Sequence, residues 1–373
     1  MKVGLVSTWN AKCGIATYTS YLGKALQQLG LNVTILAERK DVLPNGYDPN
    51  FDSPLKYIEC WSRYESYDKL VETVKKGKFD VIHIQHQFGL FPYQQTLKQL
   101  LVDLKGLGSR VVVTLHDVIG FNPQMADYFG CIVEYADSII VHTDLCKQLM
   151  VRVWKCPTEK LKLIPHGTKL ISVPTVEEAR KQLNLPLDKK IILSWGFIWE
   201  SKGLLELVEI LAELNKTFPN VMLIHAGGMH PVISKKDYLK KIFKKALQLG
   251  VRPENFKITG FLDEQRIVQY FGACNLIVLN YMRGSASASG AAHRALASHR
   301  PIVGTDDPCI AEIPKYTVPR FDKQALLQGI IKVFENKTLQ KQLVEKAEKV
   351  AEETSWENVT EQHKKVYDSF FKV

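Results

Sequence analysis

The stretch SASASGAAHRALASHRPIVGT, residues 285–305, runs from a loop of small residues into a helical pattern and then into a short β-branched strand. A helix leading into such a strand is typical of α/β proteins with a parallel sheet. A loop of Ser, Ala and Gly also lets an anion approach the backbone, and the helix behind it directs free N–H groups and its positive dipole end at that anion. The stretch predicts an α/β fold and an anion site; the alternative is a tightly packed, alanine-rich helix without a ligand.

The same alternation of strands and helices continues along the rest of the chain. Apolar residues recur every three or four positions between the strands, as in residues 14–30, where Gly30 ends the helix. Continuous apolar strands separated by helices indicate parallel sheets that are covered on both faces. The expected strands are KVGLVS (2–7), NVTILA (32–37), VIHIQ (81–85), RVVVTLH (110–116), SIIVHT (138–143), KIILSWGFI (190–198), NVMLIHAGG (220–228), FKITGF (256–261), NLIVLNY (275–281) and PIVGT (301–305).

A break in this alternation divides the chain into domains. Two prolines and a glycine interrupt it at LKLIPHGTKLISVPTVEEA, residues 161–179, and 373 residues are too many for one ordinary core. We therefore expect two doubly wound, Rossmann-like α/β domains over residues 1–168 and 169–350, followed by a C-terminal helix over 351–373. Ligands of doubly wound sheets bind at the carboxyl ends of the strands, so the expected site is a central cleft between the two domains.

Two helical patterns in the second half of the chain are amphipathic. The pattern over 337–372 places four apolar residues on one stripe, for which core packing is the expected role; they are Trp356, Val359, Val366 and Phe370. The segment 235–250 carries six lysines, and its other face is apolar; the apolar residues are Tyr238, Leu239, Ile242, Phe243, Ala246 and Leu247. This basic helix is compatible with peripheral contact to an anionic membrane, although a solvated helix with one core-facing stripe is the more common case.

Composition and charge narrow the class of protein. The chain is 46% hydrophobic and 24% charged, with a net charge of +10, which suits an anionic ligand, a nucleic acid or an anionic membrane without choosing among them. Charge is the only feature that points to nucleic acid, so we expect no nucleic-acid partner. The seven cysteines form no C-x-x-C pair, which favours reduced thiols in the cytoplasm and no zinc site. No apolar run is long enough to span a bilayer, and the N-terminus does not read as a signal peptide.

Polar residues at the ends of the early strands are the first site candidates. Gly14, in the first strand-to-helix loop, permits close approach of a ligand to the backbone, although a plain turn glycine is the alternative. His116 ends the strand RVVVTLH, where it can donate to a sugar hydroxyl or to developing charge; a structural histidine is the alternative. Gln85 and His86 end the preceding strand and are expected to line the same site. The spacing of His83 and His86 places them on opposite faces of a strand, so we expect no metal site.

Basic residues mark the corresponding strand ends of the second half. Lys202 lies where the chain leaves a strand and enters a helix, a position from which a lysine can reach a phosphate; a solvated lysine is the alternative. Arg283, Ser289, Gly290 and Arg294 belong to the small-residue loop and the helix that follows it. Two arginines flanking such a loop favour an anionic ligand.

Nearly the whole chain resembles the retaining glycosyltransferases of family four, which have the two-domain GT-B architecture. The matching pieces occur in the family's order and spacing, and it is this order that carries the resemblance. They are the loop CGIATYT, DVIHIQH, VVVTLHD, the IPHGT hinge, GFIWESKGL, LIHAGG, ITGF, HRPIVGTD and SWENV. The last of these resembles the closing helix of the family, which usually crosses back onto the first domain.

The resemblance implies a role for each matching residue. Gly14 matches the glycine whose amide approaches the donor phosphate, and His116 matches the histidine near the transferred sugar. Lys202 matches the lysine that binds the diphosphate, and Ser289 and Gly290 match the loop whose amides meet that diphosphate.

Further residues are placed at the donor by the same resemblance. The segments LIHAGG and ITGF put the nucleotide at Gly227, Gly228, Phe261 and Leu262. The nucleotide-sugar would then belong to the second domain and the acceptor to the first.

Four positions depart from the family pattern. The family usually has two glutamates eight positions apart, and this chain has Ala286 and Arg294 there. A usual arginine is Phe197, and the usual asparagine of the hinge is His166. Some family members carry an S-x-S-G form in place of the glutamates, so the change does not indicate an inactive protein.

The resemblance implies transfer of a hexose, with retention, from a nucleotide-diphosphate sugar to a carbohydrate or glycolipid acceptor. The nucleotide-sugar would be a substrate, and no cofactor or metal is expected. One alternative is a related sugar phosphorylase, and another is a non-catalytic module that binds a nucleotide or sugar. The expected location is the cytoplasm, either free or peripheral at the inner face of the membrane.

Overall fold

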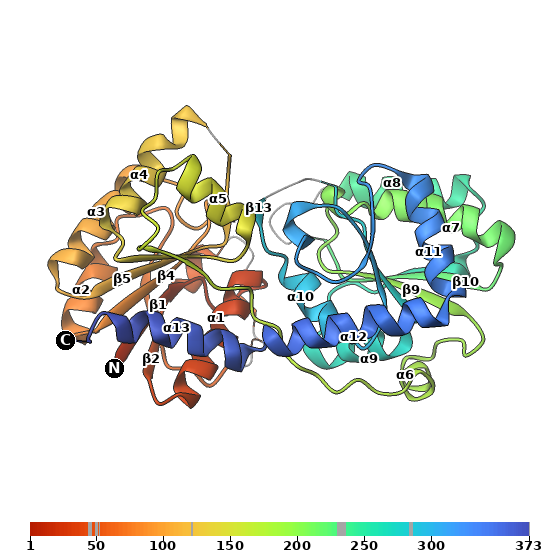
Figure 1. The fold of residues 1–373 in the computed structure, drawn as a ribbon, viewed down its shortest axis with the longest axis horizontal. Coiled ribbons are helices and arrows are strands. Elements are labelled where there is room, and N and C mark those ends of the chain that lie inside the picture. The colour runs from red at the N-terminus through yellow and green to blue at the C-terminus, as the bar shows by residue number, and fades with distance from the viewer. Residues whose placement is uncertain are drawn as a thin grey trace. The chain divides into compact units, whose positions relative to one another are not determined.

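The computed structural model describes residues 1–43, 47–48, 51, 53–120, 122–229, 236–282 and 286–372. The chain forms two compact units (Figure 1). Unit 1 comprises Met1–Gly167, Ser285–Gly290 and Thr354–Val373, and unit 2 comprises Thr168–Gly284 and Ala291–Glu353.

Unit 1 is built on a parallel sheet, to which the described residues contribute seven strands in the order β3-β2-β1-β4-β5-β7-β8. The strands are β1 (Lys2–Ser7), β2 (Asn32–Glu38), β3 (Tyr57–Trp61), β4 (Val81–His86), β5 (Arg110–Leu115), β7 (Ser138–Val141) and β8 (Leu161–Leu163). The helices are α1 (Gly14–Gln28), α2 (Asp68–Gly77), α3 (Gln94–Gly106), α4 (Ala126–Tyr135), α5 (Asp144–Arg152) and α13 (Trp356–Ser369).

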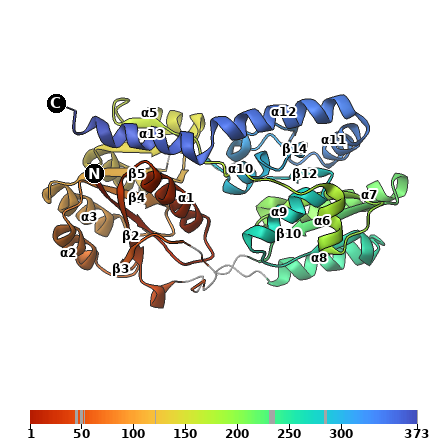
Figure 2. The same cartoon turned by 90° about the horizontal axis from the view of Figure 1, so that it is seen from below.

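Helices cover both faces of this sheet (Figure 2). One core cluster lies between the sheet and α2, α3, α4 and α5, and a second lies between the sheet and the pair α1 and α13. The central strands are buried on both sides because of this double cover, which explains their continuous apolar sequences.

Unit 2 repeats the plan with a parallel sheet that its described residues form in the order β11-β10-β9-β12-β14-β15. The strands are β9 (Lys190–Trp195), β10 (Val221–Ala226), β11 (Phe256–Ile258), β12 (Leu276–Leu279), β14 (Ile302–Thr305) and β15 (Tyr316–Val318). The helices are α6 (Val176–Leu183), α7 (Leu204–Thr217), α8 (Lys236–Gln248), α9 (Glu264–Ala273), α10 (Gly290–Leu296), α11 (Lys323–Glu335) and α12 (Lys337–Glu353). One core cluster includes residues of α6, α9, α10 and α12, and the other includes residues of α7, α8 and α11.

The expected α/β fold with two parallel sheets is confirmed, and all ten expected strands are present. Within the two parallel sheets, three short strands were not expected from the sequence, namely β3, β8 and β15. The single helix expected over 337–372 is two helices, because Ser355 caps α13 by accepting a hydrogen bond from the Asn358 amide at 3.3 Å.

The small-residue loop groups with unit 1, although the sequence places it in the second half of the chain. Residues Ala286–Ser287 form the short strand β13, which pairs antiparallel with β6 (Asp117–Val118) at the end of β5. This pairing is the physical reason why Ser285–Gly290 belongs to a different unit from the helix that it begins.

Candidate active site

In unit 1 the candidate site residues lie at the point where the strand order reverses. The sheet runs outward from β1 in one direction through β2 and in the other through β4. Doubly wound sheets bind their ligands at the carboxyl ends of the strands beside such a reversal. The loop after β1 leads to Gly14, and β4 ends with Gln85 and His86.

His116 donates a hydrogen bond to Gln85, and this bond bears on the tautomer of the histidine. The Nε2 atom of His116 lies 3.0 Å from Oε1 of Gln85, and because an amide oxygen can only accept, the ring nitrogen donates. Burial, followed by the neighbouring His142 and His166, holds the pKa of His116 well below its usual range. The ring is therefore neutral near pH 7, and its Nδ1 is an acceptor.

Tyr18 holds this histidine in place from helix α1. Its ring makes an edge contact with the ring of His116 at 4.7 Å between centroids and a second with His166 at 5.1 Å. The ring of Trp356 on α13 packs on the same tyrosine at 4.9 Å. His116 thus has a fixed ring orientation and a fixed tautomer.

The backbone near the predicted diphosphate loop is tightly fitted in one place and open in another. A Cβ atom added at Gly290 would lie 3.0 Å from Nε2 of His166, so a larger residue would displace that ring. A Cβ atom at Gly14 would meet no atom of the described residues within 4 Å, and the glycine is exposed at the N-terminus of α1. Ser289 is buried. Helix α10 has only seven residues, so its dipole alone is a weak anion site.

Asp117, directly after His116, is a further site candidate. It begins β6 and pairs with Ser287 of the small-residue loop. Burial raises the pKa of its carboxyl from 3.8 to about 6. Its Oδ2 accepts a long hydrogen bond of 3.4 Å from Nε2 of Gln87, and its buried Oδ1 has no hydrogen-bond partner among the described residues. A buried carboxyl with a raised pKa and an oxygen without a described partner, next to His116 in the sequence, is typical of a functional site.

His86 is not available to line a ligand site, and this corrects the expectation from the sequence. Its side chain is fully buried, and its Nε2 lies 2.7 Å from the hydroxyl of Tyr128 on α4. Its ring stacks on Phe91 at 5.7 Å. Successive strand residues point to opposite faces, and His86 takes the face covered by α4. Gln85 is also buried, and its side-chain oxygen accepts the hydrogen bond from His116.

In unit 2 the strand order reverses between β9 and β12, and the loops after these strands meet. The loop after β9 contains the short 3-10 helix Glu200–Lys202, which ends at Gly203 with φ of 59°. The carbonyl of Gly203 accepts a hydrogen bond of 2.9 Å from Nδ2 of Asn280, directly after β12. The ammonium of Lys202 lies 3.2 Å from the ring centroid of Tyr281. Lys202 is thus held at the reversal point, where the resemblance places the diphosphate.

Two glycines make a narrow turn at the end of β10. A Cβ atom at Gly227 would lie 1.8 Å from the carbonyl oxygen of Gly196, so only glycine fits. His225 braces this turn, with Nε2 at 3.1 Å from the Gly196 oxygen. A Cβ atom added at Gly228 would lie 3.1 Å from the amide nitrogen of Phe261. The predicted nucleotide-binding residues Gly227, Gly228 and Phe261 are therefore neighbours.

An aromatic pair adjoins these glycines. The rings of Phe197 and Phe261 lie 5.4 Å apart, and Phe261 is 48% exposed. Phe197 stands where the family has an arginine, so an apolar platform replaces a cation at this place. Leu262, the fourth predicted nucleotide residue, instead packs against the core cluster of α6 and α9.

Arg294 is held by neighbours within unit 2. Its guanidinium lies 5.2 Å from the ring centroid of Trp195 and 3.7 Å from the carboxylate of Glu264, which also pairs with Lys169. Its buried Nη2 makes no hydrogen bond to any described residue. This is the atom that approaches Glu264, at ion-pair distance but without a hydrogen bond. Arg283 lies outside the described residues.

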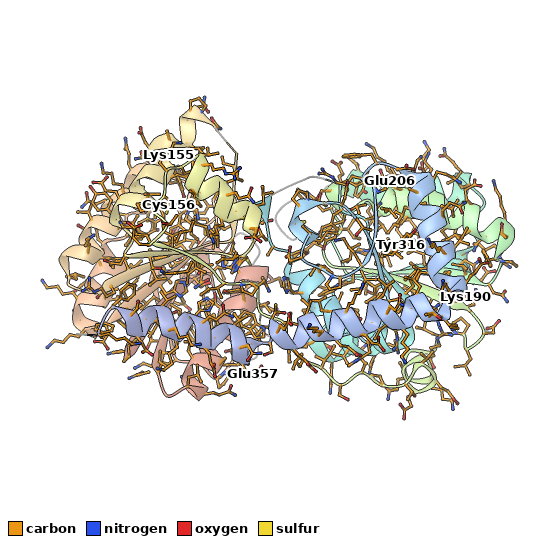
Figure 3. All side chains as sticks on the ribbon, viewed as in Figure 1. Lys155, Cys156, Lys190, Glu206, Tyr316 and Glu357 are labelled. Carbon is orange, nitrogen blue, oxygen red and sulfur yellow. The ribbon has the colours of Figure 1, made fainter. Side chains whose placement is uncertain are left out.

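Glu206, in the first turn of α7, is a half-buried carboxyl that sequence reasoning missed (Figure 3). Burial raises the pKa of this carboxyl, and its Oε2 has no hydrogen-bond partner among the described residues. Like Asp117, it carries no sequence signal, because its burial arises only in the folded chain. Within the described ranges, no group of three His, Cys, Asp or Glu side chains is arranged to hold a metal ion.

Family models match the greater part of both units. The model of Glycosyltransferase Family 4 matches residues 13–170, and that of Glycosyl transferases group 1 matches residues 175–350. A processive diacylglycerol alpha-glucosyltransferase from Acholeplasma laidlawii is 24% identical over 254 residues, which cover 64% of this chain and 69% of that protein.

Solved structures share the whole fold. Alr3699/HepE from Anabaena, in complex with UDP, has a TM-score of 0.79 and 16% identity, over 99% of this chain and 100% of that one. Sucrose-phosphate synthase from Thermosynechococcus elongatus has a TM-score of 0.76 and 21% identity, over 100% and 99% of the two chains. The two family matches, together with this fold, lead to one conclusion: the chain belongs to the family 4 glycosyltransferases and is an enzyme with the GT-B architecture.

Proposed function

We propose that the protein transfers a hexose, with retention of anomeric configuration, from a nucleotide-diphosphate sugar to a carbohydrate or glycolipid acceptor. The observation that carries the proposal is that both sheets place their polar candidates at the reversal of strand order. In unit 2 these are Lys202 and the Gly227–Gly228 turn, and in unit 1 they are His116, Asp117 and the open amide end of α1 at Gly14.

The donor class is supported by two similar structures. Alr3699/HepE was solved with UDP and with UDP-glucose. The exposed ring of Phe261 beside two glycines offers a flat surface for a base, and Lys202 offers a cation for a phosphate. We therefore expect a uridine diphosphate sugar to bind to unit 2.

The acceptor is a proposal by likeness to a curated relative. The Acholeplasma protein is named for glucosyl transfer to diacylglycerol, and it is similar over most of this chain. All seven cysteines are free, as expected for an enzyme of a reducing compartment. In the part of the chain that the structure describes, no helix combines the length and the apolar character needed to cross a membrane.

Catalysis would consist mainly of positioning and of stabilising the leaving diphosphate. The bond between the anomeric carbon and the phosphate oxygen breaks, and the acceptor oxygen bonds to the same face of that carbon. The acceptor proton passes to the leaving phosphate oxygen. Lys202, Arg294 and the amides of Gly14, Ser289 and Gly290 would stabilise the negative charge that develops there.

We assign two residues of unit 1, His116 and Asp117, as acceptors of hydrogen bonds from substrate hydroxyl groups. The Nδ1 acceptor of neutral His116 would receive a hydrogen bond from a hydroxyl of the transferred sugar. The unpartnered Oδ1 of Asp117 would receive one from the attacking hydroxyl of the acceptor and orient it.

The donor is tested by a thermal-shift panel of nucleoside diphosphates and their sugars, because a ligand that binds only the folded state raises Tm. The donor thus identified then serves in a transfer assay with NMR analysis of the product anomer. An inverted product contradicts the retaining mechanism, and sugar release that depends on inorganic phosphate identifies a phosphorylase instead.

The role of Lys202 is tested with a matched control at the start of β9, the strand that leads to the loop of Lys202. Lys202→Met is expected to lower kcat about a hundredfold or more, because it removes a cation from the leaving group. Lys190→Met removes a lysine from the other end of β9, where the ammonium also lies over aromatic rings, at 5.3 Å from Phe218 and 5.3 Å from Phe334 (Figure 3). Equal activity of the two folded variants would refute the assignment of Lys202.

A further inference from the structure

The exposed face of helix α8 has a composition that the sequence pattern did not predict. The pattern placed six apolar residues on one core-facing stripe. In the structure Tyr238, Ile242 and Ala246 are buried, but Phe243 is 49% exposed and Leu247 is 81% exposed. The helix therefore has a second apolar stripe, one turn long, that faces solvent.

Lysines flank this outer stripe. At about 100° per residue, Lys240 and Lys244 project within about 100° of Phe243 and Leu247 on the helix surface, and Lys241 projects beside Lys244, about 120° from Leu247. The side chain of Lys240 is 80% exposed, and Lys241 and Lys244 are exposed as well.

Acidic groups nearby neutralise only part of this charge. Asp237 lies 3.7 Å from Lys240, and its side chain is 89% exposed. Lys245, on the other side of the helix, forms an ion pair with Glu209 at 3.3 Å. The outer face of α8 therefore combines a net positive charge with two apolar side chains.

We propose that this outer face, defined by Lys240, Lys241, Phe243, Lys244 and Leu247, docks the protein on an anionic membrane surface. A helix in the membrane interface needs apolar side chains that enter the acyl boundary and basic ones that meet the headgroups, and this face presents both. The proposal is independent of the sugar donor and of the catalytic residues. It extends the proposed function by giving a glycosyltransferase with a lipid acceptor a way to reach it.

Other partners fit the face less well. A second copy of this chain would bring the lysines of one α8 against those of the other, which is repulsive. A nucleic acid would pair with the lysines but would leave Phe243 and Leu247 exposed, because a phosphate backbone offers no apolar surface.

The test is flotation of the full chain with vesicles of phosphatidylcholine alone and with vesicles in which about one third of the lipid is phosphatidylglycerol. We expect binding to the anionic vesicles only, weakened by added salt. Phe243→Ser with Leu247→Ser is expected to reduce binding more than tenfold, because it removes both apolar side chains. Lys240→Gln with Lys241→Gln and Lys244→Gln is expected to reduce it about fivefold per lysine.

A matched control removes the same charge from another helix of unit 2. Lys341, Lys346 and Lys349 are exposed on α12, and their triple change to Gln is expected to leave vesicle binding intact. The thermal shift caused by UDP reports the fold and the donor site of every variant, so a failed donor assignment is distinguishable from failed docking.

Several outcomes would overturn the proposal. These are no binding of the wild type to anionic vesicles, equal weakening by the α12 control, or binding that survives loss of the two apolar residues. Self-association or RNA binding that depends on the α8 lysines, without vesicle binding, would assign the face to a different partner and would also overturn it.

Discussion

Replacing Asp117 by Asn is expected to stabilise the protein at neutral pH while reducing its activity. Burial raises the pKa of this carboxyl from 3.8 to about 6, so the folded state disfavours its charge. Between these two pH values the folded chain holds a proton that the unfolded chain has lost, and stability therefore falls as pH rises through this window. Above pH 6 the full cost of the buried charge is present, and below 3.8 it is absent.

The size of the effect follows from the same two values. At about 1.36 kcal/mol for each pKa unit, the cost of the charge at pH 7 is at most about 3 kcal/mol. For a unit of this size that free energy corresponds to a rise in Tm of roughly 6 to 12 °C. The gain should nearly vanish by pH 4, because the folded wild-type carboxyl is then protonated and the unfolded one is only about half ionised.

The assay is the melting temperature of wild type and variant, followed between pH 4 and 8 by circular dichroism and compared with transfer rates at pH 7. Asp137→Asn is the matched control, because Asp137 accepts a hydrogen bond of 2.8 Å from the Val111 amide and faces Arg110. We expect that change to lower Tm. An Asp117→Asn variant that is no more stable at pH 7 than the wild type, or that retains full transfer, would refute the reasoning.

Three further predictions concern glycines and a buried histidine. Gly14→Ala should leave Tm within about 1 °C, because the added Cβ meets nothing, but should weaken donor affinity about tenfold or more in calorimetry by occupying the space before the amide. Gly227→Ala should cost about 3 kcal/mol or more in urea unfolding, because its Cβ would overlap the Gly196 carbonyl; an unchanged urea midpoint would contradict this. Burial lowers the pKa of His363 to about 4, so the unfolded chain takes up this proton below pH 6.5 and the folded chain resists it. The Tm of His363→Gln should therefore fall less than that of the wild type between pH 6.5 and 4.5, and an equal fall would contradict the assignment.

The sequence predicted the central strands well because they are long apolar runs with breaks on either side. It missed β3, whose first residues Tyr57 and Ile58 are exposed at the edge of the sheet and lack the apolar pattern. The sequence pattern also runs through α12 and α13 as one helix, because the apolar spacing continues across Ser355. The helix is interrupted there by the N-cap of α13.

The candidate site was less predictable because its chemistry depends on tertiary contacts. The alternation of a strand shows that Gln85 and His86 point to opposite faces, but it cannot say which face α4 covers. The tautomer of His116 depends on an amide 31 positions away, and the raised pKa of Asp117 depends on the burial of its carboxyl. These properties exist only once the loops after β4 and β5 are folded.

The position of α13 has a consequence for the order in which the protein can fold during synthesis. Trp356 fills the space beside Gly167, where an added Cβ would lie 2.4 Å from its ring, and Val359 and Tyr367 complete the core beneath α1. About 190 residues separate Gly167 from this helix, and a ribosome adding about 5 to 20 residues per second needs roughly 10 to 40 s to make them. Throughout that interval the first half of the nascent chain has an uncovered apolar face. Unit 1 can therefore complete its core only after unit 2 has been synthesised. A premature stop before residue 356 leaves the N-terminal half with this apolar face exposed, as a substrate for chaperones.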